Sequence, residues 1–144
     1  MSVLYRPLLS SLPVDTTEPW TDDIFKPNDL SLCYGNFSAK PAWEKYVWRR
    51  LTDIYPDAKV GDTIFKDRAD ENDIFQGALG DCYFLGALST LAEVPGRIES
   101  HFKTKRITKS GRYEINFYKM GLPITVVVDD YFPCVSATGG PAFS

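Results

Sequence analysis

The chain has 144 residues, of which 44% are hydrophobic and 24% are charged, and these values are ordinary for one compact globular unit. A formal net charge of −3 provides no basic field to attract a phosphate backbone, so we expect no nucleic acid partner. No apolar stretch approaches the roughly 20 residues that span a bilayer, and we expect neither a signal peptide nor a membrane partner.

Residues 1–40 are rich in proline and in Ser, Thr, Asp and Asn, with single aromatic residues between them. Proline at this density prevents a long helix or a central strand. We predict an extended N-terminal arm over residues 1–40, which either lies on a surface through its aromatic residues or stays mobile. A protein core then covers residues 41–144. The prolines are Pro7, Pro13, Pro19 and Pro27, and the aromatic residues include Tyr5, Trp20 and Phe25.

The stretch PAWEKYVWRRLTDIYP, residues 41–56, has apolar positions at three- and four-residue spacing. Pro41 stands just inside its start and Pro56 at its end, so the pattern predicts a short amphipathic helix. Residues 57–73 are acidic and turn-rich, which predicts a surface loop, and they lack the spacing of an EF-hand. The periodic positions of the predicted helix are Trp43, Tyr46, Val47, Leu51 and Ile54, with the stem of Arg50.

A second helical pattern begins at Cys82 and runs to about Ala92. Its apolar stripe consists of Phe84, Leu85, Leu88, Leu91 and Ala92, and Pro95 and Gly96 end it. A short helix is then expected through Ile98 and Phe102.

Residues 112–133 alternate apolar and polar side chains, turn at 120–123 and continue as a β-branched run, which predicts an antiparallel hairpin. The residues from Cys134 onwards look like a loop. Helices combined with an antiparallel hairpin place the chain in the α+β class.

Cys82 follows the glycine-rich turn QGALGDC and opens the central helix. A helix N-terminus presents unpaired N–H groups and a partial positive charge, which stabilise a thiolate. Gly77 and Gly80 let the backbone approach a substrate closely, and Asp81 is a candidate N-cap. The amide of Gln76, six residues before the thiol, is placed to donate to an oxyanion. Taken alone, a helical cysteine is more often a small buried residue than a nucleophile, so both roles stay open at this point.

The string QGALGDCYFLGAL resembles the active-site cysteine signature of the calpain family of cysteine peptidases. The resemblance extends to DIF on its upstream side and to YEINFYKMGLPITVVVDDYFP downstream, and it covers residues 41–144. It implies a papain-like α+β fold, specifically the first protease-core subdomain, in which a central helix starting at the cysteine packs with other helices and a small antiparallel sheet. Tyr83 stands where the family usually has tryptophan. The matching residues are Gln76, Gly77, Leu79, Gly80, Asp81, Cys82, Phe84, Leu85, Ala87 and Leu88.

In that family the first subdomain supplies the nucleophile and the oxyanion glutamine, and a second subdomain supplies histidine and asparagine. The resemblance therefore implies Cys82 as the nucleophile and Gln76 as the oxyanion donor. It also implies a second subdomain, in cis or in trans, as a partner of this one. An isolated half is expected to expose the face that this partner covers.

The family's calcium site in this subdomain uses a carboxylate just before the glutamine, which matches Asp73, and loop carbonyls near Lys66 and Arg68. Its second carboxylate lies near the chain end, where this sequence has Pro141. Loss of a carboxylate removes both charge and an oxygen ligand from a hard-cation site. We expect no required cofactor, with Asp73 as the matching calcium ligand.

The chain has one histidine, His101, nineteen residues after Cys82. In papain-like enzymes the base arrives from about 130 residues or more downstream of the cysteine. The far end of a helix that begins at Cys82 also lies about 15 Å from the thiol at 1.5 Å per residue. We therefore expect His101 to be a surface residue and not the catalytic base.

Two functions from different classes follow. One is a calpain-like cysteine endopeptidase, a hydrolase of protein substrates, of which this chain is the nucleophile-bearing half. The other is a proteolytically inactive calpain-like module that binds protein partners in a larger, cytoskeletal assembly. The presence of Cys82 and Gln76 favours the first, and the incomplete triad favours the second.

The chain has three cysteines, and this small, odd number argues against a disulfide framework and for a reducing compartment. We expect a cytoplasmic location, with association to the cytoskeleton in the second function. A redox or metal role is weak because the chain has no Cys-x-x-Cys motif. The three residues are Cys33, Cys82 and Cys134.

Overall fold

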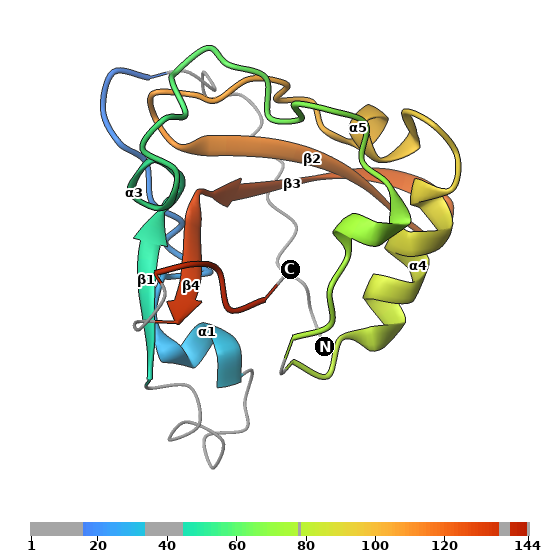
Figure 1. Cartoon of the computed structure of the whole chain (residues 1–144), viewed down its shortest axis with the longest axis horizontal. Helices are drawn as coiled ribbons and strands as arrows, with labels where there is room; N and C mark the ends of the chain where they lie inside the picture. Colours follow the sequence, from blue (N-terminus) through green and yellow to red (C-terminus); the bar gives the residue numbers. More distant parts are fainter. Residues whose placement is uncertain (1–15, 34–44, 78, 136–138, 144) are drawn as a thin grey trace.

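The computed structural model describes residues 16–33, 45–77, 79–135 and 139–143. In that part of the chain, short helices accompany two antiparallel two-stranded sheets, which confirms the α+β class. The β1–β4 sheet and helix α4 lie on opposite sides of the molecule, with hairpin β2–β3 running between them across the top of the view (Figure 1). The elements are α1 (Asp29–Cys33), β1 (Tyr46–Arg50), α3 (Leu51–Ile54), the 3-10 helix η3 (Glu71–Asp73), α4 (Cys82–Ala92), α5 (Arg97–His101), β2 (Arg112–Lys119), β3 (Leu122–Asp129) and β4 (Tyr131–Val135).

Strands β2 and β3 form the hairpin predicted from the alternating pattern. Their antiparallel register pairs every residue of the two strands, beginning with Arg112 opposite Asp129. The connecting residues Met120 and Gly121 have φ values of 53° and 77°. Positive φ at both central positions is what a two-residue type I′ turn requires, so local turn geometry and strand patterning agree.

The polar face of β2 is covered near the start of the strand. Arg112 is 1% exposed and Glu114 is 7% exposed, and an Arg112 Nη1–Glu114 Oε1 distance of 2.9 Å makes them a buried ion pair. The ring of Trp20 lies 5.9 Å from the Arg112 guanidinium carbon. The residues around Trp20 therefore help to cover this end of the hairpin.

The described part of the predicted arm is attached to the protein core. Trp20 N donates to Ser110 O over 2.7 Å, and Arg50 Nη2 donates to Trp20 O over 2.9 Å. Asp22 N donates to Asp129 Oδ2 over 2.8 Å. Residues 20–22 thus lie on the base of the hairpin, while residues 1–15 and 34–40 fall outside the described residues. The boundary between arm and core stays a prediction.

Residues 46–50 form strand β1, so the predicted helix over residues 41–56 is wrong in this stretch. Strand β1 pairs antiparallel with β4, with Tyr46 opposite Val135. Only the single turn α3 that follows is helical, and residues 41–44 lie outside the described residues. Tyr, Val and Trp favour strands, and β4, about 80 positions further along the chain, supplies the backbone partners. Cys134 and Val135 consequently belong to a strand and not to the expected loop.

The loop of residues 57–70 is fastened to the segment that follows α5. Gly61 N donates to Ile107 O, and Ile107 N donates to Asp62 O, each over 2.8 Å. Closer to η3, Ala69 N donates to Glu99 Oε1 over 3.0 Å. This last bond joins the acidic loop to α5.

The Glu99 carboxylate gives this attachment a pH dependence. Its hydrogen bond from Ala69 N–H lowers the pKa of Glu99 below the ordinary value of 4.5. A lowered folded-state pKa means that the stabilisation is complete above the ordinary pKa and is lost as pH falls through the folded value. We expect Glu99→Ala to lower the free energy of unfolding at pH 7 by about 1 kcal/mol or less, because the carboxylate is partly exposed. Urea unfolding at a series of pH values should show this difference shrinking as the pH falls below the ordinary value of 4.5, and a constant difference would contradict the assignment.

Helix α4 begins at Cys82 and ends at Ala92, as the apolar periodicity predicted. Leu85 and Ala92 are the buried residues of the helix, and α5 follows it after Gly96, whose φ is 75°. With 11 residues α4 is the longest helix in the described part of the chain, and no helix there is long and apolar enough to cross a bilayer. The helix presents its first turn to solvent, and this exposure matters for the chemistry of Cys82.

Candidate active site

Cys82 is exposed and is the first residue of α4. The backbone N–H groups of Phe84 and Leu85 both donate to Asp81 O, over 2.8 and 3.1 Å, so the first helical turn closes directly over the thiol-bearing residue. The thiol therefore stands at the N-terminal end of the helix, where the first backbone N–H groups have no partner within the helix. The prediction that Cys82 opens a helix is confirmed, and the thiol is not a buried core residue.

The side chain of Gln76 closes the loop that leads into α4. Its Nε2 donates to Leu79 O over 2.7 Å, to Asp81 Oδ1 over 3.0 Å and to Gly77 O over 3.1 Å. An amide nitrogen has two N–H groups, so these acceptors share them. The amide is therefore positioned by the loop and is tied to the residue directly before Cys82.

Asp81 is the N-cap residue of α4, but its side chain does not cap the helix. Its φ and ψ of −110° and 17° differ from the extended conformation typical of an N-cap. The carboxylate oxygen Oδ1 instead accepts from Gln76 Nε2. The N-cap position was predicted correctly. The bond from Gln76 was not predicted, because no sequence pattern indicates it.

The two glycines of the turn have different surroundings. Gly80 has open space around the position where a Cβ would stand, so the backbone there is accessible to another molecule. At Gly77 the same position is blocked by Ala142 and Phe143. The expected close approach to Gly77 is therefore made by the chain's own C-terminal segment.

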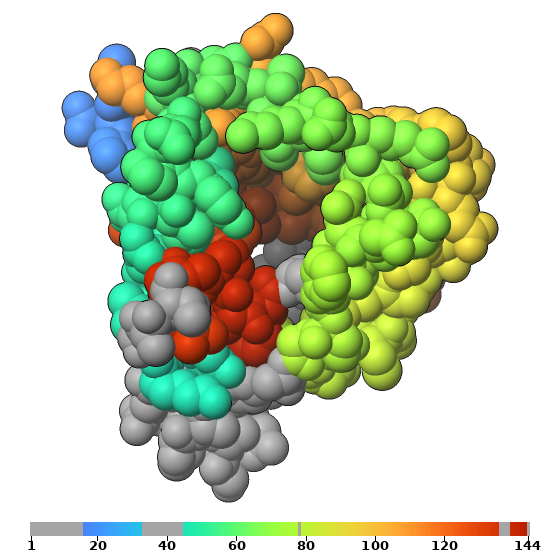
Figure 2. Space-filling view, in the orientation of Figure 1, coloured from blue at the N-terminus to red at the C-terminus, as the bar shows by residue number. Residues whose placement is uncertain are grey.

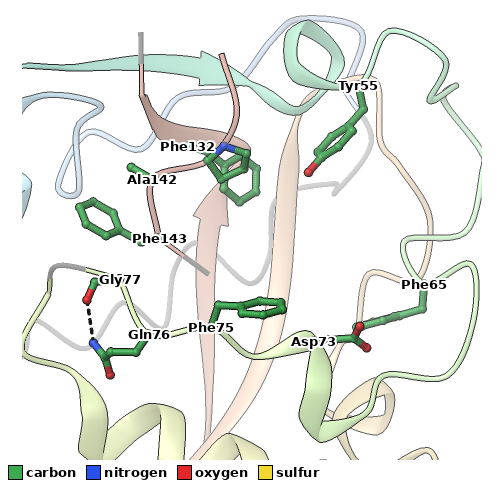
Figure 3. Close-up of a pocket in the computed structure, with 10 residues that line it drawn as sticks. Tyr55, Phe65, Asp73, Phe75, Gln76, Gly77, Phe132, Ala142 and Phe143 are labelled. Carbon is green, nitrogen blue, oxygen red and sulfur yellow. Dashed lines mark hydrogen bonds between the residues drawn. The ribbon is translucent and has the colours of Figure 1, made fainter. Parts of the chain in front are cut away.

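A pocket of about 700 Å³ lies beside Gln76 (Figure 3). Figure 2 shows the surface hollowed between the C-terminal residues in red and the loop before α4 in yellow-green. Aromatic side chains dominate the lining, and Phe75 and Tyr55 are 68% and 52% exposed. An apolar surface of this kind is open to a covering segment. The lining residues are Tyr55, Phe65, Asp73, Phe75, Gln76, Gly77, Phe132, Pro141, Ala142 and Phe143.

Asp73 lies at the end of η3 and at the rim of this pocket. Its Oδ2 accepts from Asp70 N over 3.0 Å, which closes a capping box. Calcium takes six to eight oxygen ligands. Within the described ranges, no three His, Cys, Asp or Glu side chains are grouped so as to hold a metal ion. Asp73 by itself does not form such a site, and its role as a calcium ligand stays a prediction.

His101 is the last residue of α5, beyond the far end of α4. Helix α4 has 11 residues and is therefore about 16 Å long. The Nδ1 atom of His101 lies 2.8 Å from Asn116 O, and its ring packs edge-on against Tyr118, with ring centroids 6.1 Å apart. His101 thus contacts strand β2 and is not bonded to Cys82.

A thiol in the first turn of a helix, with a side-chain amide shortly before it, is the arrangement expected of the nucleophile in a cysteine peptidase. Comparison with known proteins identifies the family. The profile described as calpain family cysteine protease matches residues 20–143. The chain belongs to the calpain family of cysteine proteases.

Individual relatives agree with this assignment. The calpain-type cysteine protease ADL1 of Oryza sativa subsp. japonica is 35% identical over 130 residues, which is 87% of this chain and 6% of the relative. DEK1 of Arabidopsis thaliana, also a calpain-type cysteine protease, is 36% identical over 129 residues, with the same coverage. Calpain-5 of Caenorhabditis elegans is 28% identical over 133 residues, 87% of this chain and 19% of the relative. The chain therefore spans less than a fifth of the length of these relatives.

Proposed function

We propose that this chain is the nucleophile-bearing first subdomain of a calpain-like cysteine endopeptidase. The observation that carries the proposal is the exposed thiol of Cys82 in the first turn of α4, next to a loop in which the Gln76 amide is bonded to Asp81. The family assignment supports it, because the match covers residues 20–143 and includes this loop.

In this scheme the Cys82 thiolate attacks the carbonyl carbon of a peptide bond and forms a C–S bond. The carbonyl oxygen becomes an oxyanion, which accepts hydrogen bonds from Gln76 Nε2 and from the Cys82 backbone N–H. The C–N bond then breaks, and the amine leaves with the proton that came from the thiol. Water hydrolyses the resulting thioester and regenerates Cys82. A histidine of a second subdomain carries the proton in both steps, and an asparagine orients it.

Gln76 must turn part of its amide towards the substrate for this role, because its N–H groups donate to Leu79 O and Asp81 Oδ1 in the free protein. We expect Gln76→Ala to lower kcat by about 10²- to 10³-fold in the protein that carries both subdomains. Gln76→Glu, which keeps the size but has no N–H donor, should lose as much. Steady-state hydrolysis of a fluorogenic peptide measures both variants. A glutamate variant with wild-type kcat would exclude oxyanion donation.

The aromatic pocket beside Gln76 supports the need for a further segment. Its exposed rings include Phe75, Tyr55 and Phe132, and the last is 38% exposed. Apolar surface of this extent is normally covered in a functional assembly. We propose that a second subdomain, in cis or in trans, supplies the histidine and the asparagine. We also propose that this subdomain, or the segment that connects it to the present chain, covers the pocket.

The deciding experiment adds the missing half. The chain alone should show no hydrolysis of casein or of a fluorogenic peptide, because its single histidine contacts strand β2 and not Cys82. Mixing or fusing it with the corresponding histidine- and asparagine-bearing segment of a calpain relative should restore turnover. Lack of turnover in a folded, stable fusion would count against the endopeptidase role.

The second candidate is a proteolytically inactive calpain-like module that binds protein partners in a larger, cytoskeletal assembly. The observation that favours it is that the chain's single histidine is bonded to Asn116 O on strand β2. In that case the exposed aromatic pocket is the binding surface, and a native full-length protein lacks both activity and labelling of Cys82 by an epoxide probe. A cytoplasmic and cytoskeletal location remains a prediction for this role.

A further inference from the structure

The loop that carries Gln76 is in tight contact with the C-terminal segment 139–143. A Cβ at Gly77 would lie 2.7 Å from Phe143 Cδ1, 3.1 Å from Ala142 O and 3.3 Å from Phe143 Cα. The φ of Gly77 lies outside the left-handed region, so the backbone conformation does not require glycine. Glycine is favoured here by the close approach of the Phe143 ring, with the backbone of residues 142 and 143 just behind it. Figure 3 shows Phe143 and Ala142 facing Gly77 across the end of the pocket.

The C-terminal segment is itself fastened to the β1–β4 sheet. Val135 N donates to Gly140 O over 3.0 Å, and Ala142 N donates to Pro133 O over 2.8 Å. From β1, Arg49 Nη1 donates to Gly139 O over 2.6 Å. The ring of Phe143 packs edge-on against Tyr46, the first residue of β1, with centroids 5.1 Å apart. Residues 139–143 are therefore held against the β1–β4 sheet by backbone and side-chain hydrogen bonds. 

On the opposite side, Gly77 is joined directly to Gln76, whose amide bonds to Leu79 O and to Asp81 Oδ1. A continuous path of contacts thus leads from the β1–β4 sheet through Phe143 and Gly77 to the residue before Cys82. The Gln76 side chain is exposed, so packing of its own atoms does little to hold it. Its position depends on the backbone of residues 76 and 77 and on the acceptors of its amide in the same loop.

We propose that Phe143 is a positioning residue, which holds the Gln76–Gly77 backbone so that the Gln76 amide stays next to Asp81, the residue that precedes Cys82. This inference rests on the proposed role of Gln76 as the oxyanion donor and adds a residue 67 positions away from it in the sequence. A donor must be held within about 0.5 Å of its productive place to stabilise the transition state. Segment 139–143, which is hydrogen-bonded to the β1–β4 sheet, is the surface that Gly77 packs against, and this contact fixes the backbone next to Gln76.

The first test uses the chain alone and needs no activity. The two side-chain amide protons of Gln76 are observed in ¹⁵N-correlated NMR spectra of wild type, Phe143→Ala and Phe143→Leu. We expect the Phe143→Ala signals to shift towards those of a free glutamine amide, and Phe143→Leu, which keeps Cδ atoms, to stay close to wild type. Phe132→Ala removes another ring of the same pocket and serves as the matched control.

The outcomes of this measurement are distinct. Unchanged Gln76 signals in Phe143→Ala would overturn the proposal, and so would an equal shift in Phe132→Ala. Signals of strand β2 report on folding, and their loss together with those of Gln76 would assign Phe143 a general structural role and also count against positioning. Gly77→Ala should disturb Gln76, and combining it with Phe143→Ala should add little, because both changes break the same contact. Independent, additive shifts in the double variant would contradict this.

The second test uses the protein complemented with the second subdomain. Phe143→Ala is expected to lower kcat per titrated active site by about 10- to 100-fold with little change in KM, and Phe143→Leu should recover most of the loss. A purely structural role would reduce the number of titrated sites and leave kcat per site unchanged. If the complemented wild type is inactive, the endopeptidase proposal fails, while the Gln76 signals still decide whether Phe143 positions this loop.

Discussion

Replacement of Cys82 by alanine is expected to abolish peptide hydrolysis by the protein that carries both subdomains. Loss of the nucleophile removes the covalent step, and we expect kcat/KM to fall by about 10⁴-fold or more. Hydrolysis of a fluorogenic peptide gives the rate, and mass spectrometry after treatment with an epoxide probe shows whether the residue is modified. The exposed thiol at the start of α4 should be labelled in wild type.

The matched control is Cys134→Ala. Cys134 is fully buried in strand β4, and burial raises the pKa of its thiol, so it reacts poorly as a thiolate. Its replacement should leave the labelling of Cys82 and the rate per active site intact. Full activity of Cys82→Ala would exclude Cys82 as the nucleophile, and labelling that depends on Cys134 would show that the buried thiol is the reactive one.

Replacement of Glu114 by alanine is expected to cause a large loss of stability. The change leaves the guanidinium of Arg112 in a site where its side chain is 2% exposed, without the carboxylate that lies 2.9 Å away. Removing one partner of a buried ion pair typically costs about 3–5 kcal/mol, because a buried charge is left without its counterion. Urea unfolding followed by tryptophan fluorescence measures the free energy of unfolding.

Glu93→Ala is a suitable control, because Glu93 is an exposed acid at the end of α4 and its removal should change stability by less than about 0.5 kcal/mol. Replacing both partners, as in Arg112→Met with Glu114→Leu, should restore most of the stability lost in the single variant. Equal losses in the Glu114 and Glu93 variants would show that the pair is not held as the structure has it.

The best-predicted parts of the molecule are those specified by neighbouring residues. The apolar stripe from Phe84 to Ala92 follows helical spacing, and helix α4 has the bounds expected of it. The β2–β3 hairpin follows from strict alternation on both sides of a short turn, and Met120 and Gly121 adopt the positive φ values that such a turn needs. In both cases the information lies within one helix or one hairpin, between residues close in the sequence.

Strand β1 shows the opposite case. Residues 46–50 fit a helical spacing and also fit a strand, and the local pattern favoured the helix. Pairing with β4 and the bond from Leu51 N to Asp130 O decide between them. Strand β4, which pairs with β1, lies about 80 positions away in the sequence, so the residues near Tyr46 do not include the contact that decides its conformation.

The features of the candidate site also fall into those that the sequence predicts and those that only the folded chain shows. Residue order alone established the family resemblance, the place of Cys82 at the start of a helix, and the proximity of Gln76 to it along the chain. The bond from Gln76 to Asp81, the contact of Gly77 with Phe143, and the attachment of segment 139–143 to the β1–β4 sheet depend on the folded chain. Helical periodicity and turn chemistry act between near neighbours, whereas these contacts join residues that only the packing of separate elements brings together.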